Sequence, residues 1–493
     1  MVLDPSLALL TDLYQLTMAQ AAFSSGMWEH EGVFHLFFRK APFQSGFTIA
    51  AGLETALDYL RGFHFSESDI AYLAQLTGAD ERPLFTKEFL AALSRLELSL
   101  DIDAIPEGTT VFPQEPLLRV RGPIAQAMLL ETPLLNLINF QTLIATKAAR
   151  ISLAARGEPV IEFGLRRAQG IDGALSASRA AYVGGCSATS NVLAGKRFGI
   201  PVRGTHAHSW VMLFDEEREA FLAYARALPG NCVFLVDTYD TIEGVRHAIE
   251  AGEWLRAHGH RLGGIRLDSG DLAWLSIEAR KLLDAAGFAD AQIVASNDLD
   301  EKVIESLKVQ GAQISVWGVG TRLVTGGDEP ALGGVYKLAL VRAPGGAWRE
   351  RIKLSEQAIK VSTPGMLQVR RYHQAQEPRA LVADAIFDEQ HGCQTAQIVD
   401  PLDPLRRRTM EPETPFNDLL VPVLRAGKQV YASPPLSEIR AHTLRELSRL
   451  DAGHKRLLSP HRYPVGLERT LHERKSALIL SHREARAQGA QEP

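Results

Sequence analysis

One stretch of the chain, GIRLDSGDL at 264–272, places a basic side chain, two acids, a hydroxyl and a glycine directly after an apolar run. In α/β folds, ligands bind at strand C-termini, because the following loop and helix N-terminus present free N–H groups. Ser269 and Gly270 could bind oxyanions through those groups, and Asp271 could bind Mg2+ or sugar hydroxyls. An ordinary helix start is the alternative, with Ser269 or Asp268 as the cap and Asp271 in the first turn.

Polar groups follow other apolar runs of the middle third in the same way. These are Arg166 and Arg167 after PVIEF, Thr205, His206 and His208 after IPVRG, NDLDE (297–301) after AQIVAS, and GVGTRLV (318–324) after AQISVW. Each group alone has a structural explanation, such as a solvated arginine pair, a helix cap or a glycine turn. Together they offer guanidinium groups, an amide-rich loop and acids, which a sugar bearing two phosphate groups would need.

Two histidines lie two residues apart in the run after IPVRG. His206 and His208 point the same way if their segment is extended, which would suit a metal. Later strand ends supply no further histidine, because His247, His258 and His260 fall in helical patterns. Two interpretations stay open for the pair: loop histidines satisfied by hydrogen bonds, or a catalytic or nucleophilic imidazole.

The spacing of apolar runs predicts the fold. Six β-rich runs begin at residues 159, 200, 232, 263, 291 and 312, and helical patterns such as 241–259 and 272–287 separate several of them. Continuously apolar strands alternating with helices are typical of a parallel sheet covered on both faces. We therefore predict an α/β barrel, with an open doubly wound sheet as the alternative.

The flanking segments predict a second, α+β domain. We expect an N-terminal domain at 1–127, the barrel at 128–340, and a segment at 341–493 that packs with the N-terminal domain. The polar tail AQGAQEP at 487–493 is expected to be frayed.

Composition narrows the class of protein. A chain of 493 residues with 46% hydrophobic content and a net charge of −5 gives no bulk attraction to nucleic acid or membrane surfaces. Three widely spaced cysteines argue against a disulfide framework and indicate a reducing compartment. No signal-peptide pattern is seen, and the apolar stretch 128–146 is too polar to span a bilayer. We predict a soluble cytoplasmic protein.

Ten motifs, in order along the chain, resemble those of the nicotinate phosphoribosyltransferases. They are DLYQLTMAQA (12–21), FFRKAPF (37–43), NLINFQTLIATKAAR (136–150), EFGLRRAQG (162–170), GTHAHSWV (204–211), RLDSGDL (266–272), SNDLDE (296–301), GVGTRLVT (318–325), VYKL (335–338) and PHRYPVGL (460–467). The resemblance implies an irregular α/β barrel of the type II phosphoribosyltransferase kind, with a second α+β domain built from both chain ends. It also implies a homodimer with shared active sites. The implied reaction is an ATP-assisted condensation of nicotinate with phosphoribosyl pyrophosphate, using Mg2+, that gives nicotinate mononucleotide and pyrophosphate for NAD salvage.

The resemblance also implies roles for single residues. The family's phosphorylated histidine matches His208, in the pattern Gly-Thr-x-Ala-His, and His206 fills the variable place. The expected contacts of the substrates are Thr205, Arg266 and Phe163 for the pyridine ring, Asp12 and Tyr14 across the dimer, Arg166 for phosphate, and Gly318, Gly320 and Thr321 for the 5′-phosphate. Asp268, Ser269, Gly270 and Asp271 are expected near the ribose, pyrophosphate and Mg2+, with Asp268 and Asp271 catalytic and Asp271 a metal ligand.

Asn191 bears on the choice of substrate. It aligns with an aspartate of nicotinamide-using relatives, and an asparagine can donate to a carboxylate without repelling it. This favours the acid, with a nicotinamide or quinolinate phosphoribosyltransferase as the alternative and an inactive scaffold of the same fold as a further one. Some family members carry a cysteine-rich metal knuckle near the C-terminus; this chain lacks those cysteines, so no structural zinc is expected.

Overall fold

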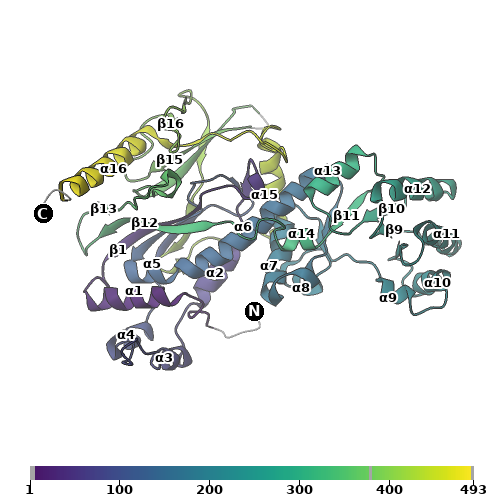
Figure 1. Cartoon of the computed structure of the whole chain (residues 1–493), viewed down its shortest axis with the longest axis horizontal. Coiled ribbons are helices and arrows are strands. Elements are labelled where there is room, and N and C mark those ends of the chain that lie inside the picture. Colours follow the sequence, from purple (N-terminus) through teal and green to yellow (C-terminus); the bar gives the residue numbers. More distant parts are fainter. Residues whose placement is uncertain (1–5, 377–379, 490–493) are drawn as a thin grey trace. The chain divides into compact units, whose positions relative to one another are not determined.

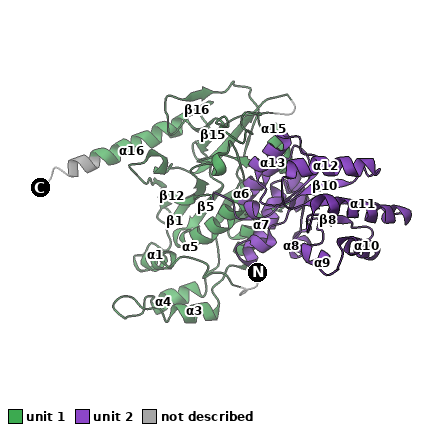
Figure 2. Cartoon of the chain, turned by 45° about the vertical axis from the view of Figure 1, so that its right-hand side comes forward, with its two compact units in different colours: residues 1–143, 331–435, 442–493 green, residues 144–330, 436–441 purple. Residues whose placement is uncertain are grey.

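A computed structural model describes residues 6–376 and 380–489 and divides the chain into two compact units (Figure 1, Figure 2). Unit 1 comprises 1–143, 331–435 and 442–493, and unit 2 comprises 144–330 and 436–441. Unit 2 thus lies almost wholly inside the predicted 128–340 segment. The predicted three-part division of the chain remains a proposal.

Unit 2 is built on a six-stranded parallel sheet. Its strands are β6 (Val160–Glu162), β7 (Ala188–Thr189), β8 (Val233–Leu235), β9 (Gly264–Leu267), β10 (Gln292–Ala295) and β11 (Val316–Val319). They pair in the order β7-β6-β11-β10-β9-β8. The first strand, β6, therefore pairs with the last, β11, as in a barrel whose strands follow one another in chain order. The predicted α/β class is confirmed.

Strands β7 and β8 are the edges of this sheet, and the described residues form no ladder between them. The expected strand at IPVRG is wrong: only an isolated bridge joins Val202 to Thr189. Pro201 has no N–H to extend the pairing into a ladder. The segment therefore pairs with β7 through two backbone hydrogen bonds to Thr189, one from its N–H and one to its carbonyl oxygen. The two-residue strand β7 was not predicted, because it is too short to show a pattern.

Helices alternate with these strands. The predicted helices at 241–259 and 272–287 are confirmed as α11 (Thr241–Ala257) and α12 (Leu272–Ala285), and α12 packs on β9 and β10. Side chains of Asp240 and Asp271 cap them by accepting from free N–H groups of their first turns. The other helices are α7 (Gly170–Val183), α8 (Val192–Phe198), α9 (His208–Val211), α10 (Glu217–Ala227), α13 (Glu301–Val309) and α14 (Thr321–Val324).

Unit 1 joins both ends of the chain in its sheets, which confirms the predicted second α+β domain. The larger sheet has the order β13-β12-β1-β5-β3-β19-β20, so the N-terminal β1 pairs antiparallel with the late β12. Its strands are β1 (Glu31–Phe38), β3 (Asp101–Ala104), β5 (Leu118–Pro123), β12 (Gly334–Arg342), β13 (Arg349–Glu350), β19 (Val421–Arg425) and β20 (Lys428–Gln429).

A second sheet of unit 1 is formed by the C-terminal part. Its order is β17-β16-β21-β15-β14-β18. The strands are β14 (Leu367–His373), β15 (Leu381–Asp388), β16 (Gln397–Val399), β17 (Arg407–Thr409), β18 (Phe416–Asp418) and β21 (Val465–Glu468), with β2 (Thr48–Ile49) and β4 (Thr110–Val111) forming a separate pair.

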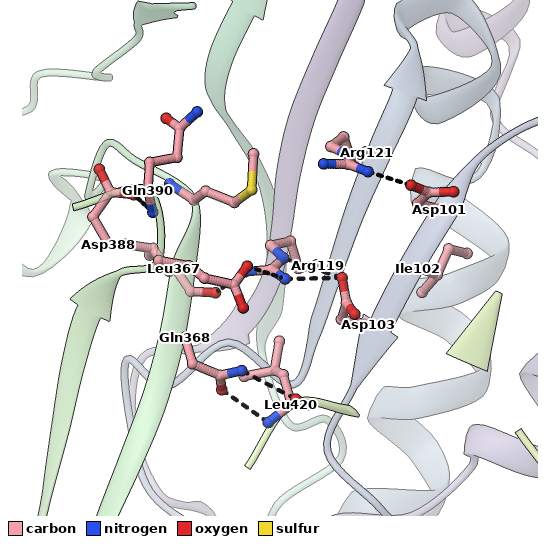
Figure 3. A network of polar contacts seen from close by, with 12 residues as sticks. Asp101, Ile102, Asp103, Arg119, Arg121, Leu367, Gln368, Asp388, Gln390 and Leu420 are labelled. Carbon is pink, nitrogen blue, oxygen red and sulfur yellow. Dashed lines mark hydrogen bonds and ion pairs between the residues drawn. The ribbon is translucent and has the colours of Figure 1, made fainter. Parts of the chain in front are cut away.

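Buried polar contacts join early and late parts of the chain within unit 1 (Figure 3). Arg119 of β5 donates to Asp103 of β3 at 2.9 Å and to the carbonyl oxygen of Leu367 at 3.1 Å. The side chain of Gln368 makes two hydrogen bonds with the backbone of Leu420: its Nε2 donates to the carbonyl oxygen, and its Oε1 accepts from the N–H. Because a buried guanidinium is costly unless it is paired, these contacts specify which strands meet.

The helices of unit 1 are α1 (Leu13–Ser24), α2 (Leu53–Gly62), α3 (Glu67–Leu73), α4 (Lys87–Leu93), α5 (Ile124–Leu129) and α16 (Arg469–Gly489), and the residue ranges of α6 (Glu131–Ala154) and α15 (Leu436–Arg449) belong partly to each unit. Helix α16 includes the first residues of the predicted frayed tail, whose last four lie outside the described residues. Across 6–376 and 380–489, no helix has the length and apolar character needed to cross a bilayer.

Candidate active site at the strand ends of unit 2

The carboxyl ends of the parallel strands in unit 2 form one rim, because parallel strands all end at the same edge. Phe163 follows β6, Asn191 follows β7, Asp237 follows β8, Ser296 follows β10, and Gly320 follows β11. Arg266 lies within the last residues of β9, with Asp268 just beyond it. The parallel pairing thus brings predicted residues from four segments of the sequence to one edge.

Arg266 is the centre of this rim. Its guanidinium donates from Nε to Ser296 Oγ at 2.8 Å, from Nη1 to Thr205 Oγ1 at 3.1 Å, and from Nη2 to Asp268 Oδ1 at 2.9 Å. The side chain is only 15% exposed, so this hydrogen-bonded fork fixes its orientation. The predicted residues Thr205, Arg266 and Asp268 therefore lie in direct contact.

Asp237 was missed from the sequence. Its Oδ2 accepts from the Asp268 N–H at 3.0 Å and from the Ser269 hydroxyl at 2.6 Å. Its Oδ1 is buried and has no hydrogen-bond partner among the described residues. The signal was present, since Asp237 comes just after the apolar run CVFLV, where strand-end acids are expected.

Phe163 packs against Gly318 of β11 and lies near Arg266. The Arg266 Cζ is 5.4 Å from the centre of its ring, which is a cation–π distance. A Cβ on Gly318 would lie 2.7 Å from two carbons of the same ring, so the glycine permits close packing. The position of the ring is thus set by the Arg266 guanidinium and by the backbone of Gly318, which has no side chain.

This packing gives a testable prediction for Gly318→Ala. The added methyl group cannot fit at 2.7 Å, so the Phe163 ring must move. If Phe163 stacks on the substrate ring, as expected from the sequence, KM for that substrate should rise by about tenfold or more, since small misplacements of a positioned group cost up to about 100-fold. Gly230→Ala is the matched control, because a Cβ there meets nothing within 4 Å. Steady-state kinetics should show an effect for Gly318→Ala alone; equal KM values would contradict the packing role.

Asn191 sits in a buried polar network behind the rim. Its Oδ1 caps α8 by accepting from the Ala194 N–H at 3.2 Å, and its Nδ2 donates to Ser178 Oγ at 3.2 Å. Ser178 and Thr189 both donate to Glu162 Oε2, at 2.8 and 2.6 Å. These bonds fix which way the amide of Asn191 faces. Its contact with substrate remains a prediction.

His208 is the first residue of α9 and is half-buried. Its Nδ1 lies 3.2 Å from the Thr238 hydroxyl, in the loop after β8. That bond orients the imidazole over the same loop that carries Asp237. His206 has different surroundings: it is buried, and its Nε2 accepts from the Leu235 N–H at 3.2 Å.

Two other predicted loops have helix-start geometry. Asp271 Oδ1 accepts from the Ala273 and Trp274 N–H groups at 3.1 and 3.0 Å, so Asp271 itself is the cap of α12. Gly270, with φ +77, makes the left-handed turn before it. Gly320 precedes Thr321, the first residue of α14. The predicted phosphate and metal roles of these residues remain predictions.

The remaining predicted residues take no part in the hydrogen bonds of Arg266 and Asp237 described above. Arg166 is exposed in a short 3-10 turn, Leu165–Arg167. Asp12 and Tyr14 belong to unit 1: Asp12 Oδ2 accepts from the Thr132 hydroxyl at 2.8 Å, and Tyr14 is 48% exposed on α1. Neither of these two residues is part of the unit 2 rim.

The rim has one feature that suits a hard cation. The described residues contain no group of three or more His, Cys, Asp or Glu side chains arranged as a metal site. The unpartnered Oδ1 of Asp237, beside Asp268, is nevertheless the carboxylate oxygen that Mg2+ prefers, and Mg2+ usually takes only one or two protein carboxylates when phosphates supply the rest. The donor set therefore fits a substrate-bound Mg2+.

Comparisons with known proteins agree with this geometry. Models of the nicotinate phosphoribosyltransferase N-terminal and C-terminal domains match residues 9–139 and 368–475. The chain is 44% identical over 470 residues to the nicotinate phosphoribosyltransferase of Bacillus subtilis (strain 168), covering 94% of this chain and 93% of the relative. It is 36% identical over 545 residues to that of Homo sapiens, covering 96% of each.

Solved structures give the same result. The crystal structure of human nicotinic acid phosphoribosyltransferase superposes with a TM-score of 0.82 at 34% identity, over 95% of this chain and 99% of that one. A nicotinate-nucleotide pyrophosphorylase from Pyrococcus furiosus matches in fold, with a TM-score of 0.68 at 21% identity, over 90% and 95%. The fold and the rim together define a type II phosphoribosyltransferase. Within that class, the chain belongs to the nicotinate phosphoribosyltransferase family.

Proposed function

We propose that the protein transfers the phosphoribosyl group of phosphoribosyl pyrophosphate to the ring nitrogen of nicotinate, giving nicotinate mononucleotide and pyrophosphate for NAD salvage. The observation that carries this proposal is the pairing of Arg266 with Phe163 at the rim. An aromatic ring and a guanidinium 5.4 Å from its centre offer a planar anion both a stacking face and a charge. Nicotinate has both properties, whereas nicotinamide lacks the negative charge.

The leaving group is expected on the side of Asp237 and Asp268. Departure of pyrophosphate from C1 of the ribose leaves an oxocarbenium-like centre, which the ring nitrogen attacks from the opposite face. When bound with the substrate, Mg2+ neutralises charge on the pyrophosphate oxygens. Asp237 and Asp268 are the residues that would hold it. Stacking on Phe163 holds the ring nitrogen in line, which lowers the entropic barrier.

We also propose that ATP phosphorylates His208. The half-buried imidazole, oriented by Thr238 next to the Asp237 loop, supports this role. A phosphoryl group there adds about 1.5 to 2 negative charges. That charge is expected to reorder the anion-binding loops and strengthen binding of phosphoribosyl pyrophosphate, and hydrolysis then allows product release.

A homodimer with shared active sites is part of the proposal. Three large apolar side chains, Leu13, Tyr14 and Met18, are exposed on α1, which is the kind of surface that a partner covers. Tyr14 would then supply the second face of the pyridine slot in the neighbouring subunit. A cytoplasmic location is proposed as well, supported by the three free thiols of Cys186, Cys232 and Cys393.

The decisive experiment measures nicotinate mononucleotide formed from nicotinate and phosphoribosyl pyrophosphate, with and without ATP. We expect product in both cases and a higher rate with ATP. Nicotinamide and quinolinate in parallel reactions test the alternative substrates. Faster turnover of either one would reject the assignment to nicotinate, and no pyrophosphate release with any of the three would favour an inactive scaffold.

Asp237→Asn tests the Mg2+ side of the site. The Oδ2 of this carboxylate accepts from Asp268 and Ser269, and its Oδ1 has no hydrogen-bond partner among the described residues. The substitution removes the negative charge of the carboxylate. We expect the Mg2+ concentration for half-maximal rate to rise by about tenfold, because one carboxylate ligand is lost. Asp240→Asn is the control, since Asp240 lies three residues on and only caps α11, where asparagine caps equally well. Identical Mg2+ titrations of wild type and Asp237→Asn would contradict the role.

A further inference from the structure

A non-strand segment, residues 201–208, bonds to both edge strands of the unit 2 sheet, β7 and β8. At one end, the Pro201 carbonyl accepts from the Thr189 N–H, and the Arg203 N–H donates to the Thr189 carbonyl, both at 3.0 Å. At the other end, His206 reaches Leu235 and His208 reaches Thr238. The segment thus attaches to β7 through its backbone, to β8 through the His206 imidazole, and to the loop after β8 through the His208 imidazole.

His206 supplies the hydrogen bond that a neighbouring strand would otherwise give. Leu235 ends β8, and its N–H donates to His206 Nε2 at 3.2 Å. Leu235 is buried, so an unpaired N–H there would be costly. The ring packs against Tyr224, Phe221 and Phe234, with centres 5.2, 5.7 and 6.1 Å away. The ring is therefore both packed and hydrogen-bonded.

The bond to Leu235 requires a neutral imidazole with its proton on Nδ1, which lies 3.4 Å from the Ala207 carbonyl oxygen. Burial lowers the pKa of His206; the bond to Ala207 opposes this, and the charges of Arg266 and His208 lower the pKa further. The surroundings of His206 thus favour the neutral imidazole, which is the form that can accept from the Leu235 N–H.

We propose that His206 is a positioning residue for the ATP-dependent step: by taking the place of a paired strand beside β8, it fixes the register in which Thr205 meets Arg266 and His208 meets Thr238. This inference rests on the proposed phosphorylation of His208. It follows from connectivity, because Thr205 and His208 flank His206 and each makes one bond to the rim, at 3.1 and 3.2 Å. Among the described residues, the bond at His206 is the polar contact that joins this stretch of the segment to β8.

His206→Leu and His206→Gln separate positioning from packing. Leucine fills the aromatic pocket but accepts no hydrogen bond, whereas the glutamine carbonyl can reach the position of Nε2 and accept from Leu235. Tyr224→Phe is the packing control, because it keeps the ring against His206 and loses only a bond to Asn231. The readout is the rate at which the full-length protein takes up acid-labile 32P from γ-labelled ATP, with the thermal unfolding midpoint measured alongside.

We expect His206→Leu to label about 30-fold more slowly than wild type, since misplacing a reacting group by about 1 Å can cost 100-fold. His206→Gln should recover to within about fivefold, and Tyr224→Phe should label at the wild-type rate. Equal labelling of His206→Leu and wild type would overturn the inference alone, as would a folded His206→Gln as slow as His206→Leu. Absence of label on the wild type, or label retained by His208→Ala, would instead reject His208 as the acceptor and the inference with it.

Discussion

Replacing His208 by alanine should abolish ATP turnover and leave only slow, ATP-independent formation of nicotinate mononucleotide. The imidazole is the proposed phosphoryl acceptor, and its position is set by the Thr238 hydroxyl at 3.2 Å. Removing a nucleophile from a coupled site costs several orders of magnitude, so we expect ATP hydrolysis to fall by roughly 1000-fold or more. The KM for phosphoribosyl pyrophosphate should rise as well, because the added phosphoryl charge can no longer order the anion-binding loops.

The measurement combines two assays on one preparation: release of ADP, and formation of nicotinate mononucleotide with and without ATP. His258→Gln is a suitable control. His258 also belongs to unit 2, but it is exposed at the C-terminal end of α11, where its Nδ1 lies 2.8 Å from the Trp254 carbonyl oxygen. ATP hydrolysis that stays coupled to product formation in His208→Ala would reject the assignment.

Arg266→Gln should reduce kcat/KM for nicotinate by about 100-fold or more. The arginine donates to Ser296, Thr205 and Asp268 at once, so the substitution removes the charge that we propose faces the substrate, and Asp268 loses its ion-pair partner. Losing one member of a desolvated charge pair costs about 2 to 5 kcal/mol. Arg266→Lys keeps the charge without the planar fork, and we expect an intermediate loss.

The informative quantity is the ratio of kcat/KM for nicotinate to that for nicotinamide. If Arg266 binds the carboxylate, the ratio should fall steeply in Arg266→Gln, because the neutral amide loses less. An equal loss for both substrates would mean that Arg266 only holds the rim together. The unfolding midpoint of each variant shows whether the rim is intact.

Much of the fold could be predicted because it depends on local patterns. Helices α11 and α12 show apolar periodicity and a glycine after the last turn, and β8, β9 and β10 are short apolar runs buried on both faces. The expected strand at IPVRG was wrong, because propensity carries no information on whether a partner strand is available. Strand β11 begins only at Val316, later than its apolar run, which starts at Ala312.

The candidate site divides in a similar way. Arg266, Asp268 and Ser269 stand in one short motif, so their proximity follows from the sequence. Asp237 and Ser296 were overlooked, although each ends an apolar run that predicted a strand. Their partners lie 28 to 32 residues away along the chain, as in the bonds from Ser269 to Asp237 and from Ser296 to Asp268. Such contacts arise only when neighbouring strands are aligned.

The sequence by itself determined the class of fold, the family, and the residue types available at each strand end, since these depend on local spacing and on motifs. The tertiary structure decided which side chains share a partner: Arg266 with three acceptors, Asp237 with two donors, and His206 with the open edge of β8. The physical reason is that parallel pairing sets strands from distant parts of the chain side by side in register. The position of β8 at the edge of the sheet, rather than any local pattern, makes a buried histidine its hydrogen-bond partner.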